Sequence, residues 1–332
     1  MPILRILMTA ALIAAIASGC SQPQELNDSM PDSVKLEALD INIERNPDDH
    51  ELLAARARVL LNLGRVNEAA ADIDKALRLA PETVEYLLLK ADICFRNGDV
   101  KGSYNALEQA EALNPESQEV QLKLGEITYY NHDYDRAMAH LTKVTEKDAN
   151  NRTALFMKGF IYKEKGDTAN AVQLFRRVCD KFPDYAPSFE QLGVLYAELG
   201  DNMALEYLGT ALQLEPNNTN VMYALALFYQ DHDDMEKAES LYRQILDLKP
   251  ESADAWHNMG WIELFFYHNL DRAIEFFTKA IEANSGYIEA YANRGIAYEN
   301  KGDRQKAKAD FEAALSLNAA YQPAVEGMKR VK

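Results

Sequence analysis

Cysteine is scarce in this sequence, and histidines do not cluster along it. Disulfides and metal sites depend on these residues. The 332 residues include three Cys and six His. The histidines are scattered along the chain and do not follow the spacing of a known metal site. A fold held together by several disulfides and a structural metal centre are therefore not expected.

Catalytic motifs are also missing. The sequence has no Gly-rich phosphate loop, no nucleophile elbow and no recognisable pair of carboxylates. The stretches at 131–133 (Asn-His-Asp) and 231–234 (Asp-His-Asp-Asp) are interpreted as solvated turns, because residues of these types favour turns. The sequence predicts a protein that is not an enzyme and uses no metal or other cofactor.

Positive charge is in short supply. The chain has 35 Lys and Arg against 52 Asp and Glu, which gives a formal net charge of −17. A protein this acidic is repelled by the phosphates of nucleic acids, and it has no excess of cations with which to cover anionic lipid headgroups. We therefore expect no nucleic-acid partner.

An apolar run lies near the N-terminus, at residues 6–17, after Arg5. It has the length of a signal-peptide core and is too short to cross a bilayer. It ends in Ala17-Ser18-Gly19-Cys20, which resembles the lipobox of bacterial lipoproteins. The resemblance implies that residues 1–19 are a lipoprotein signal peptide and that the Cys20 thiol is acylated. An ordinary secretory signal followed by an incidental Cys is the alternative.

An acylated Cys20 carrying two or three acyl chains satisfies the requirement for stable membrane anchoring. By resemblance to lipoprotein sorting in Gram-negative bacteria, Ser21 after the Cys favours the outer membrane. The periplasmic and the surface face both remain open. Residues 20–31 are polar and form a predicted tether that reaches at most roughly 40 Å from the lipid. The expected location is a bacterial cell envelope, with the membrane contacted through the N-terminal lipid.

From residue 50 onward the sequence repeats with a period of 34 residues. In the copy at 288–321, apolar residues recur at spacings of three and four on both sides of Lys301-Gly302-Asp303, which predicts two amphipathic helices joined by a turn. Two sites hold small residues in every copy, so that helices can cross closely there. The first site, position 8, holds Ala57, Ala91, Gly125, Gly159, Gly193, Ala226, Gly260 and Gly295, and the second, position 20, holds Ala69, Ser103, Ala137, Ala171, Ala204, Ala238, Ala273 and Ala307.

This pattern resembles the tetratricopeptide repeat family over about four fifths of the chain. The copy at 253–287 shows it most fully, with Trp256, Gly260, Ala273 and Phe277. The resemblance implies an all-α fold, an α-solenoid in which helix–turn–helix repeats wind into a right-handed superhelix. Eight repeats are expected, one of them a residue short and one a residue long. They span 50–83, 84–117, 118–151, 152–185, 186–218, 219–252, 253–287 and 288–321.

Both ends of the array are expected to be capped. Residues 32–49 have the pattern of a second helix alone and form a predicted N-terminal half-repeat, and residues 322–332 form a predicted C-terminal capping helix. Cys94 and Cys179 lie two repeats apart, too far for a disulfide. We expect them to be buried, unreactive thiols.

In this family the first helices of the repeats line a concave groove that holds a segment of another protein. The family's groove positions carry mostly apolar side chains in this sequence, and two asparagines of a kind that can bind a peptide backbone in relatives. These candidate protein-binding residues are Leu88, Phe95, Tyr129, Phe156, Phe160, Tyr223, Leu227, Asn258, Trp261 and Asn293. The alternative is that several of the aromatic residues only pack against the neighbouring first helix.

Carboxylates accompany these positions in the first three repeats, at Glu51, Glu85, Asp92, Glu119 and Glu126. We therefore expect the partner to be a protein or peptide segment with a basic end. The predicted function is a membrane-anchored scaffold or adaptor that binds this segment in its groove. Two further functions stay open: a fixed structural subunit of an envelope secretion or pilus-type assembly, and an adaptor for cell-wall enzymes.

Overall fold

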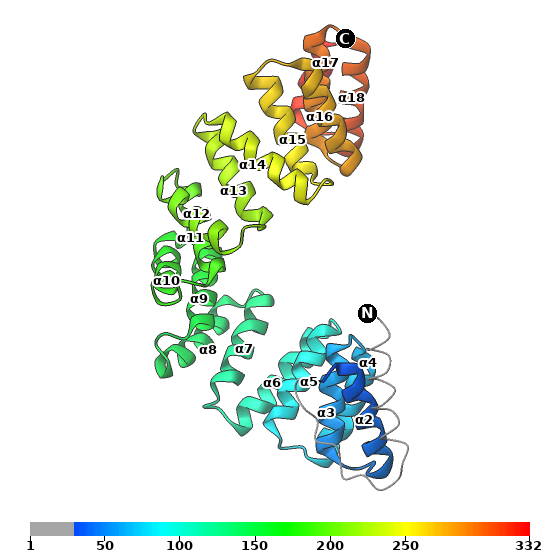
Figure 1. The fold of residues 1–332 in the computed structure, drawn as a ribbon, viewed down its shortest axis with the longest axis vertical. Helices are drawn as coiled ribbons and strands as arrows, with labels where there is room; N and C mark the ends of the chain where they lie inside the picture. Colours follow the sequence, from blue (N-terminus) through cyan, green and yellow to red (C-terminus); the bar gives the residue numbers. More distant parts are fainter. Residues whose placement is uncertain (1–29) are drawn as a thin grey trace, which may run out of the picture. The chain divides into compact units, whose positions relative to one another are not determined.

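The computed structural model describes residues 30–332, which are entirely helical and divide into two compact units with their boundary between Met157 and Lys158. The predicted signal peptide, the lipidation site Cys20 and most of the tether lie outside the described residues. Figure 1 shows the helices following one another as antiparallel hairpins. The prediction of an all-helical solenoid of stacked helix pairs is confirmed.

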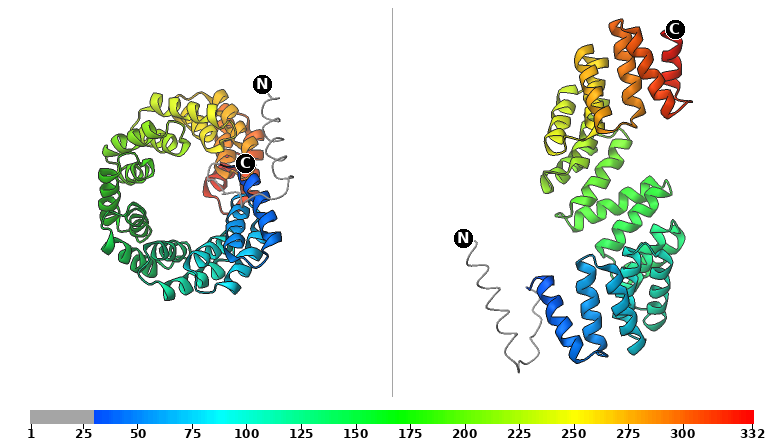
Figure 2. Two further views of the ribbon diagram at one scale, coloured as in Figure 1. Left: turned by 60° about the horizontal axis from the view of Figure 1, so that its bottom comes forward. Right: turned by 90° about the vertical axis from the view of Figure 1, so that its right-hand side faces the viewer.

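The first unit begins with a single helix and continues with helical hairpins, as Figure 2 also shows. Its helices are α2 (Asp32–Arg45), α3 (His50–Asn62), α4 (Val66–Leu79), α5 (Val84–Arg96), α6 (Val100–Leu113), α7 (Gln118–Tyr130), α8 (Tyr134–Lys147) and the beginning of α9 (Arg152–Glu164).

The second unit continues the same arrangement and ends with a single short helix. It contains the remainder of α9, then α10 (Thr168–Lys181), α11 (Ala186–Glu198), α12 (Met203–Leu214), α13 (Thr219–Asp231), α14 (Met235–Leu248), α15 (Ala253–Trp261), the π-helix η1 (Ile262–Phe266), α16 (Leu270–Ala283), α17 (Ile288–Lys301), α18 (Arg304–Leu317) and α19 (Gln322–Arg330).

The small residues at position 8 let the two helices of a repeat touch. A Cβ added to Gly125 would lie 2.7 Å from a methyl carbon of Leu141, and one added to Gly260 would lie 2.8 Å from the ring of Phe277. Real Cβ atoms do not approach other atoms this closely, so a larger residue cannot be accommodated without displacing the second helix. The facing side chains, Leu141 and Phe277, are fully buried. Each hairpin is therefore closed by a small residue packed against a large one.

The turns inside the repeats require a residue in the left-handed region. Five of them use a glycine, with φ between 65° and 87°. The other three use His132, Asp233 and His268, with φ of 56–59°, which costs more for a residue that carries a Cβ. Asp or Asn side chains then cap most of the second helices, as Asp303 does by accepting a hydrogen bond from the backbone N–H of Lys306.

The two single helices cover the ends of the array. Leu39 and Ile43 of α2 are buried, and α2 packs against α3. At the other end, Gly327 of α19 lies directly against the ring of Phe311, so that Phe311 is fully buried. Both helices remove from water an apolar face that would have no neighbouring repeat to cover it.

The two repeats of unusual length differ from the others at specific helices. The repeat at 186–218 has a second helix, α12, of 12 residues, whereas the second helices of the other repeats have 14. The repeat at 253–287 has its extra residue in the first helix, where the chain leaves the α-helix after Trp261 and forms the π-helical turn η1. A π-turn holds one more residue than an α-turn, and π-bulges of this kind are frequent at functional sites.

Candidate functional site

The first helices of the repeats form the inner face of each unit. Within the first unit α3 contacts α5, and within the second α11 contacts α13, whereas consecutive second helices do not approach one another to the same extent. A stack whose first helices are closer together than its second helices curves toward the first helices. Side chains on this face are the ones that the sequence predicted to bind a partner.

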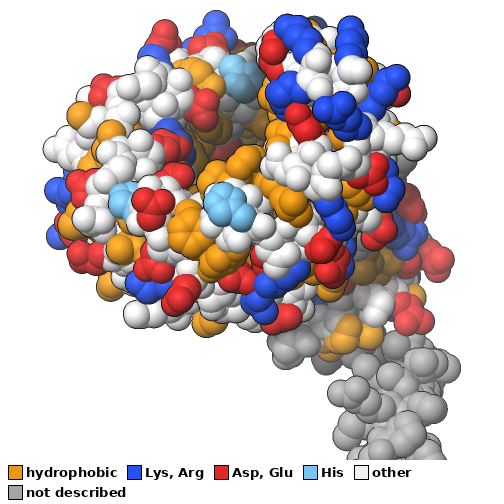
Figure 3. All heavy atoms as spheres, turned by 90° about the horizontal axis from the view of Figure 1, so that it is seen from above, with side chains coloured by type: hydrophobic (Ala, Val, Ile, Leu, Met, Phe, Trp, Pro, Cys, Tyr) orange, Lys and Arg blue, Asp and Glu red, His pale blue; other side chains and the backbone are white. Residues whose placement is uncertain are grey.

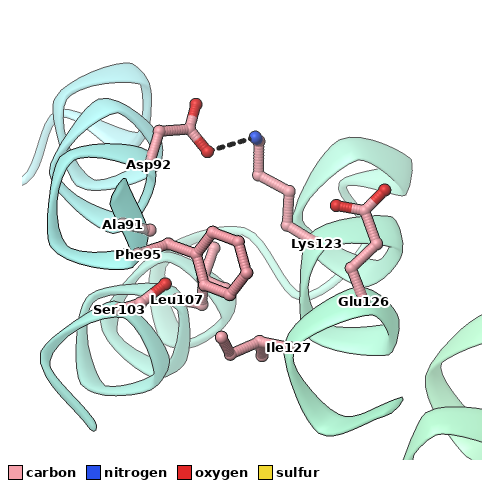
Figure 4. A pocket seen from close by; sticks show the side chains of 8 residues that line it. All are labelled: Ala91, Asp92, Phe95, Ser103, Leu107, Lys123, Glu126 and Ile127. Carbon is pink, nitrogen blue, oxygen red and sulfur yellow. Dashed lines mark hydrogen bonds and ion pairs between the residues drawn. The ribbon is translucent and has the colours of Figure 1, made fainter. Parts of the chain in front are cut away.

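A pocket of about 70 Å³ opens on this face between α5 and α7 (Figure 4). Ala91, Ser103 and Leu107 form its floor, Phe95 and Ile127 form apolar walls, and polar groups line its rim. A pocket of this size has room for a few water molecules or a small aliphatic group. Phe95 is 44% exposed although it is a large apolar residue, so part of its ring is available to a ligand.

The rim of the pocket is charged and mostly acidic. Lys123 Nζ lies 2.5 Å from Asp92 Oδ1, so these two charges neutralise one another. Glu126 is exposed and forms no ion pair among the described residues. Desolvation raises the pKa of its carboxyl, an effect that nearby Lys123 opposes and Asp92 reinforces. The pocket therefore combines an apolar interior with one surplus carboxyl group.

Phe95 belongs to a larger exposed aromatic pair. Its ring meets that of Tyr130 edge to face, with centroids 5.2 Å apart, and Tyr130 is 59% exposed. Tyr129, which the sequence predicted to bind a partner, is half-buried, with its ring 5.7 Å from that of Tyr134. The helical register turns Tyr130, and not its neighbour Tyr129, toward Phe95. Tyr130 therefore extends the exposed surface around Phe95.

In the second unit, one histidine that the sequence pattern did not predict to be a site residue joins three residues that were predicted. Asn258 Nδ2 donates a hydrogen bond to the hydroxyl of Tyr223 at 3.0 Å, and its Oδ1 lies 3.2 Å from His257 Nδ1. On the other side of the ring, Asn293 Nδ2 lies 3.0 Å from His257 Nε2. Tyr223, Asn258 and Asn293 therefore form one polar network through His257, which connects α13, α15 and α17.

Both ring nitrogens of His257 have hydrogen-bond partners when the ring is neutral. A proton on Nδ1 is then donated to Asn258 Oδ1, and the unprotonated Nε2 accepts from the Asn293 amide. Burial lowers the pKa of His257, although the hydrogen bond to Asn258 acts in the opposite direction. Because Asn258 is buried with both atoms of its amide hydrogen-bonded, a peptide backbone would have to displace existing hydrogen bonds to reach it.

The other predicted residues lie on the first helices with different degrees of exposure. Leu88 is buried in the core of the first unit and offers little surface to a ligand. Phe160 is half-buried against Phe175, with ring centroids 5.5 Å apart. Trp261 is half-buried and its ring lies 5.3 Å from that of Phe265. Phe156 and Leu227 are also half-buried.

Groups suited to other chemistry do not gather on the described surface. Residues 30–332 contain no cluster of His, Cys, Asp and Glu side chains that could hold a metal ion. None of the helices in this part of the chain has the length and hydrophobicity needed to span a bilayer. Cys94 is half-buried and Cys179 is buried, and neither forms a disulfide. In the view of Figure 3, hydrophobic side chains gather near the middle of the visible face with charged side chains around them.

Comparison with known families agrees with the repeat pattern. Models of the tetratricopeptide repeat match residues 54–117, 95–159, 153–185, 203–261 and 288–321, which together make up more than half of the chain. No curated protein matches this sequence.

Solved structures share the fold. A tetratricopeptide repeat protein from Parabacteroides merdae is 19% identical, with a TM-score of 0.57 over 75% of this chain and 98% of that one. The C-terminal part of a TPR repeat-containing protein from Cytophaga hutchinsonii is 21% identical, with a TM-score of 0.58 over 72% of this chain and 98% of that one. At these identities the likeness establishes the arrangement of helices and leaves the partner unspecified.

Proposed function

The chain belongs to the tetratricopeptide repeat family, and on that basis we propose that it is an envelope-anchored scaffold that binds a segment of another protein on its first-helix face. Proteins built from these repeats generally act by binding protein or peptide segments. The observation that carries the proposal for this chain is the pocket between α5 and α7, where a partly exposed Phe95 lies beside the carboxyl group of Glu126.

The chemistry of this pocket defines the segment that fits it. An aliphatic side chain would enter between Phe95 and Ile127 and bury apolar surface on both. A Lys or Arg next to that side chain would meet Glu126, whose carboxyl group has no ion-pair partner among the described residues. The basic group would mainly speed association and make it sensitive to salt, while the aliphatic anchor would provide most of the affinity.

The anchoring part of the proposal rests on the N-terminal sequence. The segment ending in Ala17-Ser18-Gly19-Cys20 resembles a lipobox, and acylation of Cys20 would tie the repeats to a membrane through a short polar tether. A scaffold held in this way would meet its partner at the membrane surface of a bacterial envelope, and Ser21 favours the outer membrane.

The test begins with capture of partners from detergent-solubilised envelopes by the full chain and by its Phe95→Ala variant. A partner of the proposed kind is recovered with the parent and depleted with the variant. Calorimetric titration of that partner should then show a loss of about 2 kcal/mol for Phe95→Ala. Leu113→Ala is the matched control, because Leu113 is equally exposed, at 42%, and belongs to the same unit but does not line the pocket. Its binding should stay within about 0.5 kcal/mol of the parent.

The identity of the captured proteins separates this function from its alternatives. One stoichiometric assembly whose binding is unchanged by Phe95→Ala would favour the fixed structural subunit. A set of cell-wall hydrolases that all depend on Phe95 would define the scaffold as an adaptor for those enzymes. Equal binding by the parent and by Phe95→Ala in the titration would contradict the pocket as the site of recognition.

A further inference from the structure

We infer that the π-helical turn of the seventh repeat is a second, separate docking site, for an arginine-containing hydrophobic segment of a partner protein. The site consists of Trp261, Phe265, Phe266 and Tyr267, which we call the aromatic turn. It lies where the first helix of the repeat ends, between α15 and α16 (Figure 1). The inference concerns a different surface from the pocket between α5 and α7 and does not depend on it.

The aromatic turn exists because of the extra residue in this repeat. Tyr267 N–H donates to the carbonyl of Ile262, five residues earlier, and His268 follows with φ of 56°. The first helices of most other repeats end in a polar residue, such as Glu164 of α9 or Lys301 of α17, although α7 ends in Tyr129-Tyr130. In this repeat the chain instead turns outward with three aromatic residues in succession.

The aromatic side chains of this turn are unusually exposed to solvent. Phe265 is 42% exposed, Phe266 46% and Tyr267 43%. The other exposed large hydrophobic residues of the described chain are isolated leucines, apart from Phe95 and Tyr130. The Phe266 and Tyr267 rings meet edge to face at 5.1 Å, and Trp261 supports Phe265 from within the helix at 5.3 Å. The rings thus support one another and present a preformed apolar surface.

The charges beside the aromatic turn are mainly carboxylates. Glu236 and Glu239 of α14, together with Glu263, raise the pKa of Tyr267, after the larger effect of desolvation. The nearby arginines are already used, since Arg243 lies 2.5 Å from Glu239 and Arg272 lies 2.7 Å from Glu263. Glu236 has no ion-pair partner among residues 30–332 and remains available.

The buried side chain of Glu263 anchors the aromatic turn to the neighbouring helix. This side chain is only 2% exposed. Its Oε1 is in ion-pair contact with Arg272, although no N–H is aligned for a hydrogen bond to that oxygen. The contact connects η1 to α16 and leaves the aromatic rings on the outer side. Glu263 is therefore a positioning residue for the aromatic turn.

Exposed aromatic faces next to a free carboxylate suit arginine better than other side chains. The planar guanidinium stacks on aromatic rings and binds a carboxylate at the same time, and it loses less hydration than an ammonium group. Apolar neighbours of the arginine in the partner would cover Phe265 and Phe266. An anionic membrane is disfavoured as the occupant, because the unpaired carboxylate of Glu236 repels its headgroups. A symmetric contact with a second copy is disfavoured because it would bring the same carboxylates of two chains together.

The test uses a phage-displayed library of random peptides selected on the purified full chain. The enriched sequences that occupy this site should carry Arg next to Leu, Ile or an aromatic residue. Binding of the corresponding synthetic peptides should weaken at least tenfold for Phe266→Ser and for Glu236→Lys, and should weaken with added salt. Glu236→Lys keeps every ring, so it separates loss of recognition from loss of structure.

Two matched controls locate the effect. Leu199→Ser removes an apolar side chain that is 60% exposed at the corresponding turn of another repeat in the same unit, and it should leave binding of these peptides unchanged. Phe95→Ala should also leave binding of these peptides unchanged. The two variants therefore test the two proposed sites separately: Phe95→Ala tests the α5–α7 pocket, and Phe266→Ser tests the aromatic turn. Circular dichroism and thermal unfolding of each variant should match the parent.

Three outcomes would overturn the inference. One is that no selected peptide is sensitive to Phe266→Ser or Glu236→Lys. Another is a concentration-dependent dimer in sedimentation that Phe266→Ser abolishes, which would assign the aromatic turn to a second copy of the chain. The third is binding of the parent, but not of Phe266→Ser, to vesicles of phosphatidylglycerol, which would assign it to a membrane.

Discussion

Gly193 of α11 packs directly against Leu208 of α12. A Cβ added to Gly193 would lie 2.6 Å from Leu208 Cγ and 2.9 Å from its backbone nitrogen. At the equivalent glycines of the other repeats, such as Gly125 and Gly260, the nearest atoms belong to side chains alone. In the short repeat the second helix itself is therefore in contact, and rotation of the Leu208 side chain cannot make enough room.

Replacement of Gly193 should destabilise the array through overpacking. Gly193→Leu is expected to lower the free energy of unfolding by about 2–3 kcal/mol, and Gly193→Ala by about 1–2 kcal/mol, because both force α12 away from α11. Urea unfolding followed by circular dichroism measures the change. Unaltered unfolding of Gly193→Leu would mean that the repeat register is wrong in this region.

Gly209 provides the matched control for this substitution. It lies in α12, one residue from Leu208, and an added Cβ would have no atom within 4 Å. Gly209→Ala should therefore stabilise the protein by about 0.5–1 kcal/mol, since alanine loses less conformational entropy in a helix. Opposite signs for Gly193→Ala and Gly209→Ala would show that close helix contact, and not glycine content, decides stability here.

The last repeat contains a buried ion pair that should matter more than the surface pairs. Arg294 Nε and Nη2 each lie 2.8 Å from one oxygen of Asp310, which is 6% exposed. Asp310→Ala would leave the partly buried guanidinium without this partner, and we expect a loss of about 3 kcal/mol in unfolding free energy. The double variant Arg294→Met with Asp310→Leu should recover most of that loss, because no unpaired charge remains.

Glu312 serves as the comparison for that experiment. Its carboxylate is 3.6 Å from Lys308 and both side chains are more than half exposed. Glu312→Gln should change the unfolding free energy by less than about 0.5 kcal/mol. Similar costs for Asp310→Ala and Glu312→Gln in thermal unfolding would contradict a structural role for the buried pair.

Cys179 should be the less reactive of the two described cysteines. Its thiol is buried and donates to Ser188 Oγ at 3.3 Å, and burial raises its pKa to about 11. Alkylation by iodoacetamide at pH 8 should therefore modify the half-buried Cys94 first, as peptide mass spectrometry would detect. Modification of Cys179 ahead of Cys94 would contradict its burial.

The same pKa has a consequence for stability. The folded protein holds the Cys179 proton more tightly than the unfolded chain does, whose thiols titrate near about pH 8.5. The contribution of this group is therefore fully present below that pH and is lost as the pH rises toward 11. Cys179→Ala should reduce the decrease in unfolding temperature between pH 8 and pH 10.

Anchoring depends on Cys20 in the proposed function. Cys20→Ala should release the protein from membranes or leave its signal peptide attached, because no acyl acceptor remains at the lipobox. Fractionation together with intact-mass measurement distinguishes these forms. A Cys20→Ala protein that still fractionates as an acylated membrane protein of mature mass would refute the lipoprotein interpretation.

Much of the fold could be predicted because each repeat shows its helices through the local spacing of apolar and small residues. The predicted capping helix at 32–49 contains α2, which begins at Asp32, and the capping segment at 322–332 contains α19, which begins at Gln322. The small residues expected at helix crossings do lie at close contacts, as Gly295 does against Phe311. Spacing of three and four residues fixes a helical face, and stacking of identical units then fixes what that face meets.

The binding surfaces were predicted less completely, because neighbouring positions on one helix differ in exposure. Phe95 is accessible whereas Leu88 is buried, although both occupy family groove positions. The asparagines at 258 and 293 were selected individually, and the structure joins them through His257. Such links form between residues of successive repeats and leave no signal within a single repeat.

The sequence alone determined the period, the all-helical repeat and the two sites of small residues at which helices cross, because these follow from side-chain spacing and size. The tertiary structure decided which of the apolar residues remain exposed. It also decided how the extra residue of the seventh repeat is accommodated: the π-helical turn leaves Phe265, Phe266 and Tyr267 exposed. That result depends on backbone hydrogen bonds and on the contact of Glu263 with the next helix, which composition and periodicity do not specify.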